Sequence, residues 1–232
     1  MLIKGIIETS FLDWDGKIST VLFVPKCNFS CPYCQNWQLI EHTEKFEEIS
    51  FERIKKFLLE RKDFVDGVCI TGGEPTLYKD LPEFAGALKE LGFGIKLDTN
   101  GSVPEMIEKL IIEKLVDYVA LDFKAPFEKY NLVTRVNAPI AKIKESISIL
   151  MNSSIDYEFR TTVVPTLLDE NDILEIANCI KGCKRYVLQQ FVPSEARNEE
   201  LRKLQPYSKE KLEKIAERAK EYIKEVKLRG VW

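Results

Sequence analysis

Histidine is almost absent from this chain, and features that mark several common classes of protein are missing with it. The 232 residues include one histidine, His42, and no second C-x2-C pair, so a zinc site of the usual kind would lack ligands. The net charge of −3 gives no electrostatic support for nucleic-acid binding. No apolar run approaches ~20 residues, so we expect no membrane-spanning helix.

Targeting and repeat signals are missing as well. The segment from Met1 to Ser10 lacks the basic region and the continuous apolar stretch of a secretion signal, so we expect a cytoplasmic protein with reduced thiols. There are no low-complexity tracts and no repeats of fixed period. With 45% hydrophobic and 31% charged residues, the composition is that of an ordinary globular protein of one-domain size.

What the chain does contain is a concentration of cysteine. Three of its six cysteines, Cys27, Cys31 and Cys34, are spaced C-x3-C-x2-C directly after an apolar run. A disulfide would leave one of the three unpaired, and a zinc site would lack its fourth ligand. Three cysteines in a loop after a strand instead suit an iron–sulfur cluster with one iron left open, as catalytic sites require.

Strands and helices are expected to alternate along the chain, which predicts parallel βαβ units with right-handed crossovers. The fold class is therefore α/β, an open (β/α)6 partial TIM-type barrel with a parallel sheet. We expect one domain over residues 1–232, with a core of about 18–193 and a C-terminal helix of about 208–227. Residues 3–11 read as a short strand or an extended lead-in. The six predicted strands cover 18–24, 67–71, 93–98, 117–123, 157–164 and 186–192.

Polar residues follow the C-terminal ends of these strands, where the active sites of parallel barrels lie. Because side chains alternate along a strand, Asp122 and Lys124 can face the interior together, with Phe123 outward. Arg160 lies on an apolar strand and needs a carboxylate partner, which could be a ligand, Glu158 or a neighbouring aspartate. The clusters on this expected rim are the cysteine loop, Gly72-Gly73-Glu74-Pro75, Asp98-Thr99-Asn100-Gly101, Asp122-Phe123-Lys124, Arg160 and Gln189-Gln190-Phe191.

The cysteine triplet, with Tyr33 before its last cysteine and Gly72-Gly73-Glu74-Pro75 after the next strand, resembles the radical S-adenosylmethionine (SAM) superfamily. The resemblance implies that the three thiolates hold one [4Fe–4S] cluster whose fourth iron binds SAM. It also implies that reductive cleavage of SAM yields a 5′-deoxyadenosyl radical, which abstracts hydrogen from a substrate. No general base is needed, which suits a chain with one histidine.

Further segments resemble the glycyl-radical-enzyme activases of that superfamily: residues 9–17, 98–101, 121–124 and 160–165, within a likeness that covers about 5–193. This resemblance implies an enzyme that generates a glycyl radical on a partner protein, with anaerobic ribonucleoside-triphosphate reductase as the expected partner. An electron donor such as flavodoxin or ferredoxin is implied too. By resemblance, the residues that contact SAM or order its site are Asn36, Gly72, Gly73, Glu74, Asp98, Asp122, Lys124 and Arg160.

Two positions depart from the activase pattern. Gln35 stands where these enzymes usually have histidine after the third cysteine, and no histidine lies near the sixth strand, where the formate-lyase activase contacts the SAM ribose. That contact must be absent or replaced, with Gln189 and Gln190 as the candidates.

The other three cysteines are expected to pack in the fold rather than to bind metal. Cys69 is expected to be a small buried hydrophobic residue, and Cys179 and Cys183 are expected to be packing residues rather than a second metal site.

Two other function classes remain as alternatives. One is a radical SAM enzyme that acts on a small molecule or a nucleoside. The other is a non-catalytic iron–sulfur or zinc protein, which has no use for the glycine pair or for the ionic rim.

Overall fold

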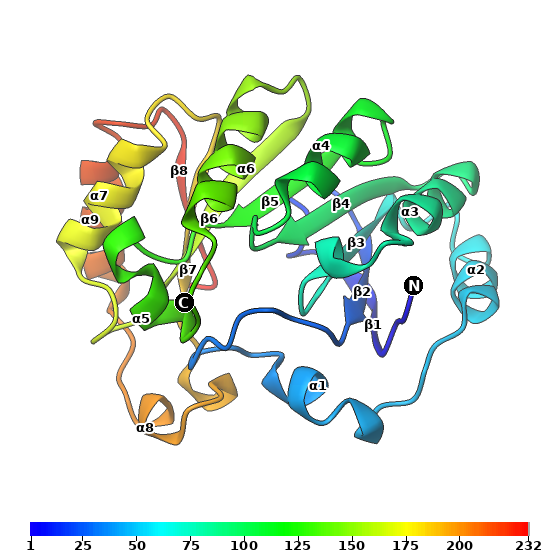
Figure 1. Ribbon diagram of the computed structural model, residues 1–232, viewed down its shortest axis with the longest axis horizontal. Helices are drawn as coiled ribbons and strands as arrows, with labels where there is room; N and C mark the ends of the chain where they lie inside the picture. Colours follow the sequence, from blue (N-terminus) through cyan, green and yellow to red (C-terminus); the bar gives the residue numbers. More distant parts are fainter. Residues whose placement is uncertain (232) are drawn as a thin grey trace.

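A computed structural model describes residues 1–231, and its centre is a single open sheet whose strands follow one another in chain order (Figure 1). Every neighbouring pair is parallel except β1 and β2, which are antiparallel. The eight strands are β1 (Gly5–Ser10), β2 (Ser19–Val24), β3 (Gly67–Gly72), β4 (Gly94–Thr99), β5 (Tyr118–Asp122), β6 (Asp156–Val163), β7 (Tyr186–Gln190) and β8 (Val226–Arg229). The predicted open parallel sheet is thus confirmed, with one further strand at each edge.

Helices occupy the crossovers, and Figure 1 shows the longer ones on the outside of the sheet. Within residues 1–231, no helix has both the length and the apolar composition needed to cross a bilayer. The longer helices are α2 (Phe51–Leu59), α3 (Leu81–Glu90), α4 (Pro104–Ile112), α6 (Ile140–Asn152), α7 (Glu170–Cys179) and α9 (Lys209–Ala219). Short helices are α1 (Trp37–Glu41), α5 (Tyr130–Thr134) and α8 (Glu199–Arg202), with 3-10 turns at Thr43–Lys45, Pro75–Leu77, Phe127–Lys129 and Pro193–Glu195.

Local sequence explains where several helices begin. Ser50 and Ser208 accept hydrogen bonds from the first-turn amides of α2 and α9, which would otherwise have no partner. Asp169 and Asp172 form a reciprocal capping box at the start of α7.

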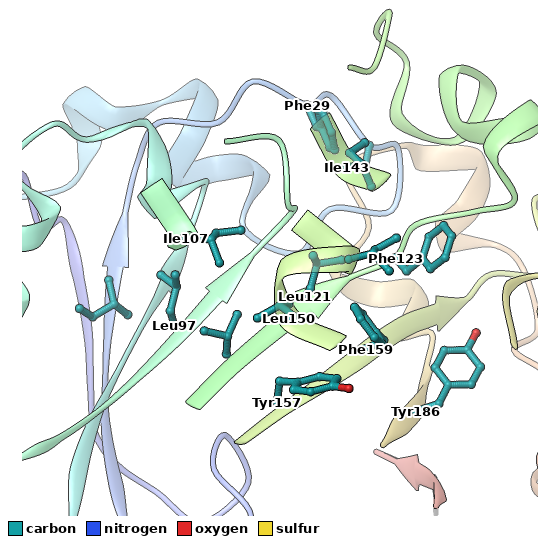
Figure 2. Close-up of a cluster of buried hydrophobic side chains, with 14 of the residues drawn as sticks. Phe29, Leu97, Ile107, Leu121, Phe123, Ile143, Leu150, Tyr157, Phe159 and Tyr186 are labelled. Carbon is teal, nitrogen blue, oxygen red and sulfur yellow. The ribbon is translucent and has the colours of Figure 1, made fainter. Parts of the chain in front are cut away.

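The main core lies between the sheet and its helices. Figure 2 shows Leu97, Leu121 and Phe159 of neighbouring strands together with Ile143 and Leu150 of α6, all fully buried. Burial of each side chain of this size contributes roughly 1.5–3 kcal/mol. This layer fixes the strands, and so the positions of the polar side chains at their ends.

The predicted C-terminal helix of about 208–227 is wrong in its second half. Helix α9 ends at Ala219, and Val226–Arg229 forms β8 beside β7. Arg229 of β8 reaches Glu158 with Nη1–Oε1 and Nη2–Oε2 distances of 2.7 and 3.1 Å. Pairing with β7 and this ion pair outweigh the helical tendency of the Lys/Glu-rich segment.

The loop between β1 and β2 closes the barrel at the N-terminal ends of the parallel strands, called the closed end below. The Trp14 ring lies 6.1 Å from the Tyr118 ring. A Cβ atom on Gly67 would come within 2.6 Å of Trp14, so this glycine makes room for the indole. Asp15 reaches across to the other edge of the sheet and pairs with Lys227 and Arg229, at 2.9 and 3.2 Å.

Candidate functional site

A cavity of about 380 Å³ lies at the C-terminal ends of the strands, called the cavity end below. The predicted rim is therefore a real feature of the fold, although its residues are spread over more than a hundred positions of the sequence. All eleven predicted site residues line the cavity: Cys27, Cys31, Cys34, Asn36, Gly72, Gly73, Glu74, Asp98, Asp122, Lys124 and Arg160.

The glycine pair packs against the backbone that leads into the cysteine loop. Gly73 N–H donates to the Val24 carbonyl at 2.7 Å, and Glu74 N–H donates to the Lys26 carbonyl at 2.5 Å. Gly72 has a φ of +109°, and a Cβ atom on Gly73 would overlap the Lys26 carbonyl. Glycine is therefore required here for the close approach of two backbone segments, whatever contact it makes with a ligand.

Glu74 ties the glycine pair to the end of β4. Its Oε1 accepts hydrogen bonds from Thr76 N–H, Thr76 Oγ1 and Thr99 Oγ1 at 3.1, 2.5 and 2.7 Å, and its Oε2 accepts from Asn100 N–H at 2.6 Å. Burial raises the pKa of the Glu74 carboxyl, although these hydrogen bonds act in the opposite direction. The carboxylate thus braces two neighbouring strand ends.

The cysteine loop is held on its outer side by distant segments. Ser30 N–H donates to the Thr134 carbonyl at 2.9 Å, and Asn198 N–H donates to the Pro32 carbonyl at 2.8 Å. Asn36 Nδ2 donates to the Gly72 carbonyl at 2.9 Å. The loop therefore has fixed anchors between and after its cysteines.

The three thiols are placed so that they can hold an iron–sulfur cluster at the cavity wall. All three are free and line both the cavity and a second hollow of about 320 Å³. Among residues 1–231, no three His, Cys, Asp or Glu side chains are close enough together to bind one metal ion. An iron–sulfur cluster takes each thiolate on a different iron, so its ligands stand apart. Burial raises the pKa of Cys27 to about 11, and bound iron would counter this by stabilising the thiolate.

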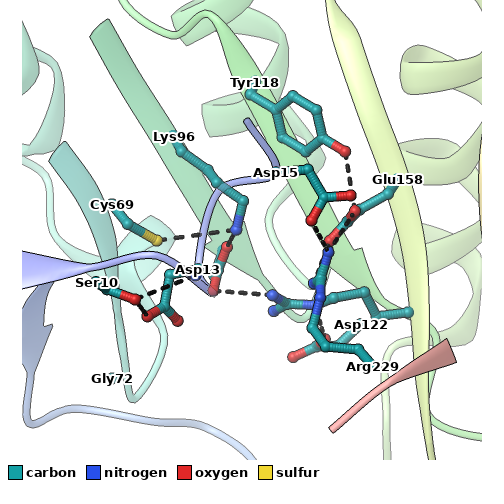
Figure 3. Close-up of polar contacts among 12 residues, drawn as sticks. Ser10, Asp13, Asp15, Cys69, Gly72, Lys96, Tyr118, Asp122, Glu158 and Arg229 are labelled. Carbon is teal, nitrogen blue, oxygen red and sulfur yellow. Dashed lines mark hydrogen bonds and ion pairs between the residues drawn. The ribbon is translucent and has the colours of Figure 1, made fainter. Parts of the chain in front are cut away.

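Five charged side chains form a chain of ion pairs along the inside of the barrel, in part shown in Figure 3. Arg160 lies in the middle, with Nη1 3.0 Å from Asp98 Oδ2 and Nε 2.8 Å from Asp122 Oδ1. Lys124 Nζ lies 3.0 Å from Asp122 Oδ2, and Lys96 pairs with Asp98. The carboxylate partners of Arg160 are therefore neighbouring aspartates, while Glu158 pairs elsewhere.

This chain of ion pairs has an excess of positive charge, since it contains three cations and two carboxylates. Burial acts to raise the pKa of Asp98 and Asp122, but the charge of Arg160, helped by the nearby lysines, lowers the pKa of both. Both aspartates are thus ionised at neutral pH. The Lys124 side chain, 17% exposed, presents the excess cation to the cavity, which suits an anionic group of a ligand.

Some cavity residues were not predicted as site residues. Asp13 reaches the cavity from the β1–β2 loop and accepts a hydrogen bond from Ser10 Oγ at 2.5 Å. Gln189 lines the cavity, whereas Gln190 points away and donates to the Tyr207 carbonyl at 3.1 Å. Of the two candidate replacements for the missing histidine, Gln189 alone faces the cavity.

The remaining cysteines lie outside the cavity lining. Cys69 is fully buried, as predicted, and its sulfur lies 3.8 Å from Lys96 Nζ. Cys183 is buried and Cys179 is exposed.

Comparison with known sequences shows the family of this chain. The sequence profile of the Radical SAM superfamily matches residues 21–180. A protein of Methanocaldococcus jannaschii, named as a candidate glycyl-radical enzyme activating enzyme, is 39% identical over 99% of this chain and 96% of its own length. The pyruvate formate-lyase-activating enzyme of Listeria monocytogenes is 31% identical over 69% of this chain and 68% of its own length.

A solved structure shows the same fold. A domain of pyruvate-formate lyase-activating enzyme from Bacteroides vulgatus superposes with a TM-score of 0.58 at 17% identity, over 71% of this chain and 99% of that domain. This likeness shows the fold, and the sequence matches show that the chain belongs to the radical SAM superfamily and, within it, to the glycyl-radical enzyme activating enzymes.

Proposed function

We propose that this protein is an iron–sulfur enzyme that uses SAM to generate a glycyl radical on a partner enzyme, with anaerobic ribonucleoside-triphosphate reductase as the first partner to test. The family and the composition of the cavity support this proposal. One [4Fe–4S] cluster would be held by Cys27, Cys31 and Cys34. Bound together, the cluster and SAM supply a 5′-deoxyadenosyl radical once an electron is delivered.

The side chains of the cavity would bind and orient SAM. Lys124 offers a cation to the carboxylate of SAM, and Asp122 holds that cation in place through its 3.0 Å ion pair. The backbone at Gly72 and Gly73 lies at the cavity wall, where it can face the amino group. Gln189 offers an amide that can bind the ribose hydroxyls.

The size of the cavity is the observation that favours a protein substrate. At about 380 Å³, it is near the lower limit for a pocket that holds one drug-sized ligand. SAM is a ligand of that size and would fill most of this space. The hydrogen donor must then approach from outside the cavity, as a segment of a second protein can.

The electron donor and cellular location belong to the same proposal. The hollow beside the cysteine loop, lined by Trp37, Glu41 and Arg197, gives a route by which a donor such as flavodoxin or ferredoxin could approach the cluster. We place this activity in the cytoplasm, where the cluster thiols stay reduced. We expect no nucleic-acid partner, because the net charge is −3, and no membrane partner.

The proposal can be tested with protein reconstituted with iron and sulfide under strict exclusion of oxygen. After reduction, we expect SAM to be converted to methionine and 5′-deoxyadenosine. With the partner reductase present, a glycyl radical doublet should develop in its electron paramagnetic resonance spectrum, with deuterium moving from α-deuterated glycine into 5′-deoxyadenosine.

Other results would point to the other two function classes. Deuterium exchange with a metabolite or a nucleoside, without a radical on any candidate partner, would identify a small-molecule enzyme. Iron binding without any cleavage of SAM would identify a non-catalytic protein.

A further inference from the structure

A closed ring of hydrogen bonds, called the asparagine ring below, joins the cysteine loop to the segment after β4. Asn28, directly after Cys27, donates from Nδ2 to Ser102 Oγ at 2.9 Å and accepts at Oδ1 from Asn100 Nδ2 at 2.9 Å. The Ser102 N–H closes the ring by donating to Asn100 Oδ1 at 2.9 Å. Both ends of the Asn28 amide are thus bonded to residues 72 and 74 positions away in the chain.

The ring connects the two sides of the cysteine loop. Asn28 lies outside the cavity lining and is exposed in the hollow on the other side of the loop. Asn100 is 5% exposed and lines the cavity, and its N–H donates to Glu74 Oε2 at 2.6 Å. The residue after Cys27 is therefore bonded to the part of the cavity wall that Glu74 braces.

The other end of the cysteine loop has a comparable link. Asn36, two residues after Cys34, donates from Nδ2 to the Gly72 carbonyl at 2.9 Å. The loop is thus bonded to the cavity wall just after its first cysteine and just after its last. Together, the two links fix the cysteine loop relative to the ends of β3 and β4.

A ligand that touches both the loop and the wall depends on this fixed arrangement. In the proposed function, SAM would contact both the cluster held by the loop and the side chains of the wall. Such a ligand binds more tightly when its two contact regions are already held in place, because binding then has less freedom to remove.

We propose that Asn28 is a positioning residue that, through Asn100 and Ser102, holds the cysteine loop against the cavity wall and thereby strengthens the binding of SAM to the cluster-loaded protein. This inference rests on the proposed function. Loss of hydrogen bonds between neutral groups should raise the Kd for SAM roughly 3- to 10-fold. Without the cluster, SAM would contact the wall alone, so the same change should leave that weaker affinity near the parent value.

The test is isothermal titration with SAM of the cluster-loaded and the cluster-free forms of each protein. Asn28→Ala and Ser102→Ala break the ring from its two sides, and Ser102, 3% exposed, also lies outside the cavity lining. Ser146→Ala is the matched control, since Ser146 is fully buried and donates to the Gly101 carbonyl at 2.7 Å. It loses a bond to the same segment without breaking the ring.

We expect both ring variants to keep the iron content of the parent and to bind SAM more weakly in the loaded form. The double variant should be no weaker than the weaker single variant, because both changes break the same ring. Ser146→Ala should lose thermal stability but keep the parent Kd. Ser102→Ala serves if Asn28→Ala does not fold.

The outcomes separate the two proposals. If the loaded parent protein does not bind SAM, the proposed function itself fails. If it does, the role of Asn28 alone is overturned by a parent Kd in both ring variants, or by an equal loss of affinity with and without the cluster. An equal loss in Ser146→Ala would overturn it too.

Discussion

The two ends of the barrel treat their buried polar groups in different ways. At the closed end, Glu158 accepts hydrogen bonds from Tyr118 Oη at 2.9 Å and from Arg229 (Figure 3). Arg185 Nη1 donates to the same Tyr118 hydroxyl at 2.9 Å. At the cavity end, the three cysteine thiols line a space that side chains of the protein do not fill. The buried Glu158 carboxylate at the closed end is paired by side chains of the chain itself, whereas the cysteine thiols at the cavity end line a space suited to ligands.

The largest effect is expected from replacing the cysteines at the cavity end. Replacement of any one of Cys27, Cys31 or Cys34 by alanine removes one of only three thiolates, so we expect SAM cleavage to be abolished. The measurement is 5′-deoxyadenosine formation by anaerobically reconstituted protein, together with iron per chain.

The other three cysteines provide the controls for that experiment. Alanine at Cys69, Cys179 or Cys183 should leave the iron content near that of the parent, because none of them lines the cavity. Loss of the cluster in the Cys179 or Cys183 variant would show that a second metal site exists.

The next largest effect is a loss of stability when the buried ion pair at the closed end is broken. Arg229→Met leaves the Glu158 carboxylate, 1% exposed, without its cation. Loss of one partner of a buried pair costs about 3 kcal/mol, so we expect the free energy of unfolding to fall by roughly that amount. Lys227→Met is the control, since its side chain is 41% exposed and surface pairs contribute about 0–1 kcal/mol.

Denaturant unfolding of the two variants checks this prediction. The rate of SAM cleavage per folded molecule should match the parent in both, because Arg229 and Lys227 lie outside the cavity lining. A loss of activity in Arg229→Met without a loss of stability would contradict the separation of the two ends.

A smaller effect concerns ligand binding at the cavity end. Lys124→Met removes the cation that faces the cavity, and a hydrogen bond to a charged group is typically worth about 1.5–3 kcal/mol. We therefore expect the Kd for SAM to rise roughly 10- to 100-fold, with iron content unchanged. Asp122→Asn should weaken binding in the same direction.

Isothermal titration of the cluster-loaded proteins with SAM measures both affinities. Lys129→Met is a matched control, because Lys129 forms a similar ion pair, with Asp172, outside the cavity lining. Normal binding by both the Lys124 and Asp122 variants would mean that this pair has no role in the SAM site.

The smallest effect appears only in acid. The folded-state pKa of Asp98 and Asp122 is lowered because the charge of Arg160 outweighs burial. Between that value and the unfolded pKa of about 3.9, the unfolded chain binds more protons, so stability rises with pH across this window. This contribution is complete above about pH 5 and is lost as the pH falls below about 4.

Unfolding measured between pH 3 and pH 7 in buffers of equal ionic strength tests this sign. Asp122→Asn should flatten the acid slope, by up to about 1.4 kcal/mol per pH unit. An identical slope in the variant and the parent would show that Asp122 gains nothing from its cations.

The parts of the fold that could be predicted from the sequence depend on neighbours in the chain. Apolar strands separated by amphipathic helices give parallel βαβ units, and this topology brings the strand ends to one rim. Alternation along β5 and the two residues after it correctly placed Asp122 and Lys124 on the same side. The topology thus predicted the rim, and the resemblance to the family supplied the eleven site residues, all of which line its cavity.

What could not be predicted depends on partners far away in the chain. The segment Val226–Arg229 continues a Lys/Glu-rich helical pattern, and only pairing with β7 makes it a strand. The bracing role of Glu74 depends on Thr99 and Asn100, 25 and 26 residues later.

The ion pair between Asp15 and Arg229 also has a consequence for the order of folding during synthesis. Its two residues are 214 positions apart, and ribosomes add roughly 5–20 residues per second. The β1–β2 loop therefore waits on the order of 10 to 40 seconds for its partner on β8. Strands β2 to β7 can associate with their neighbours in the order in which they emerge. The ion pairs of the closed end are then among the last contacts that a nascent chain can form.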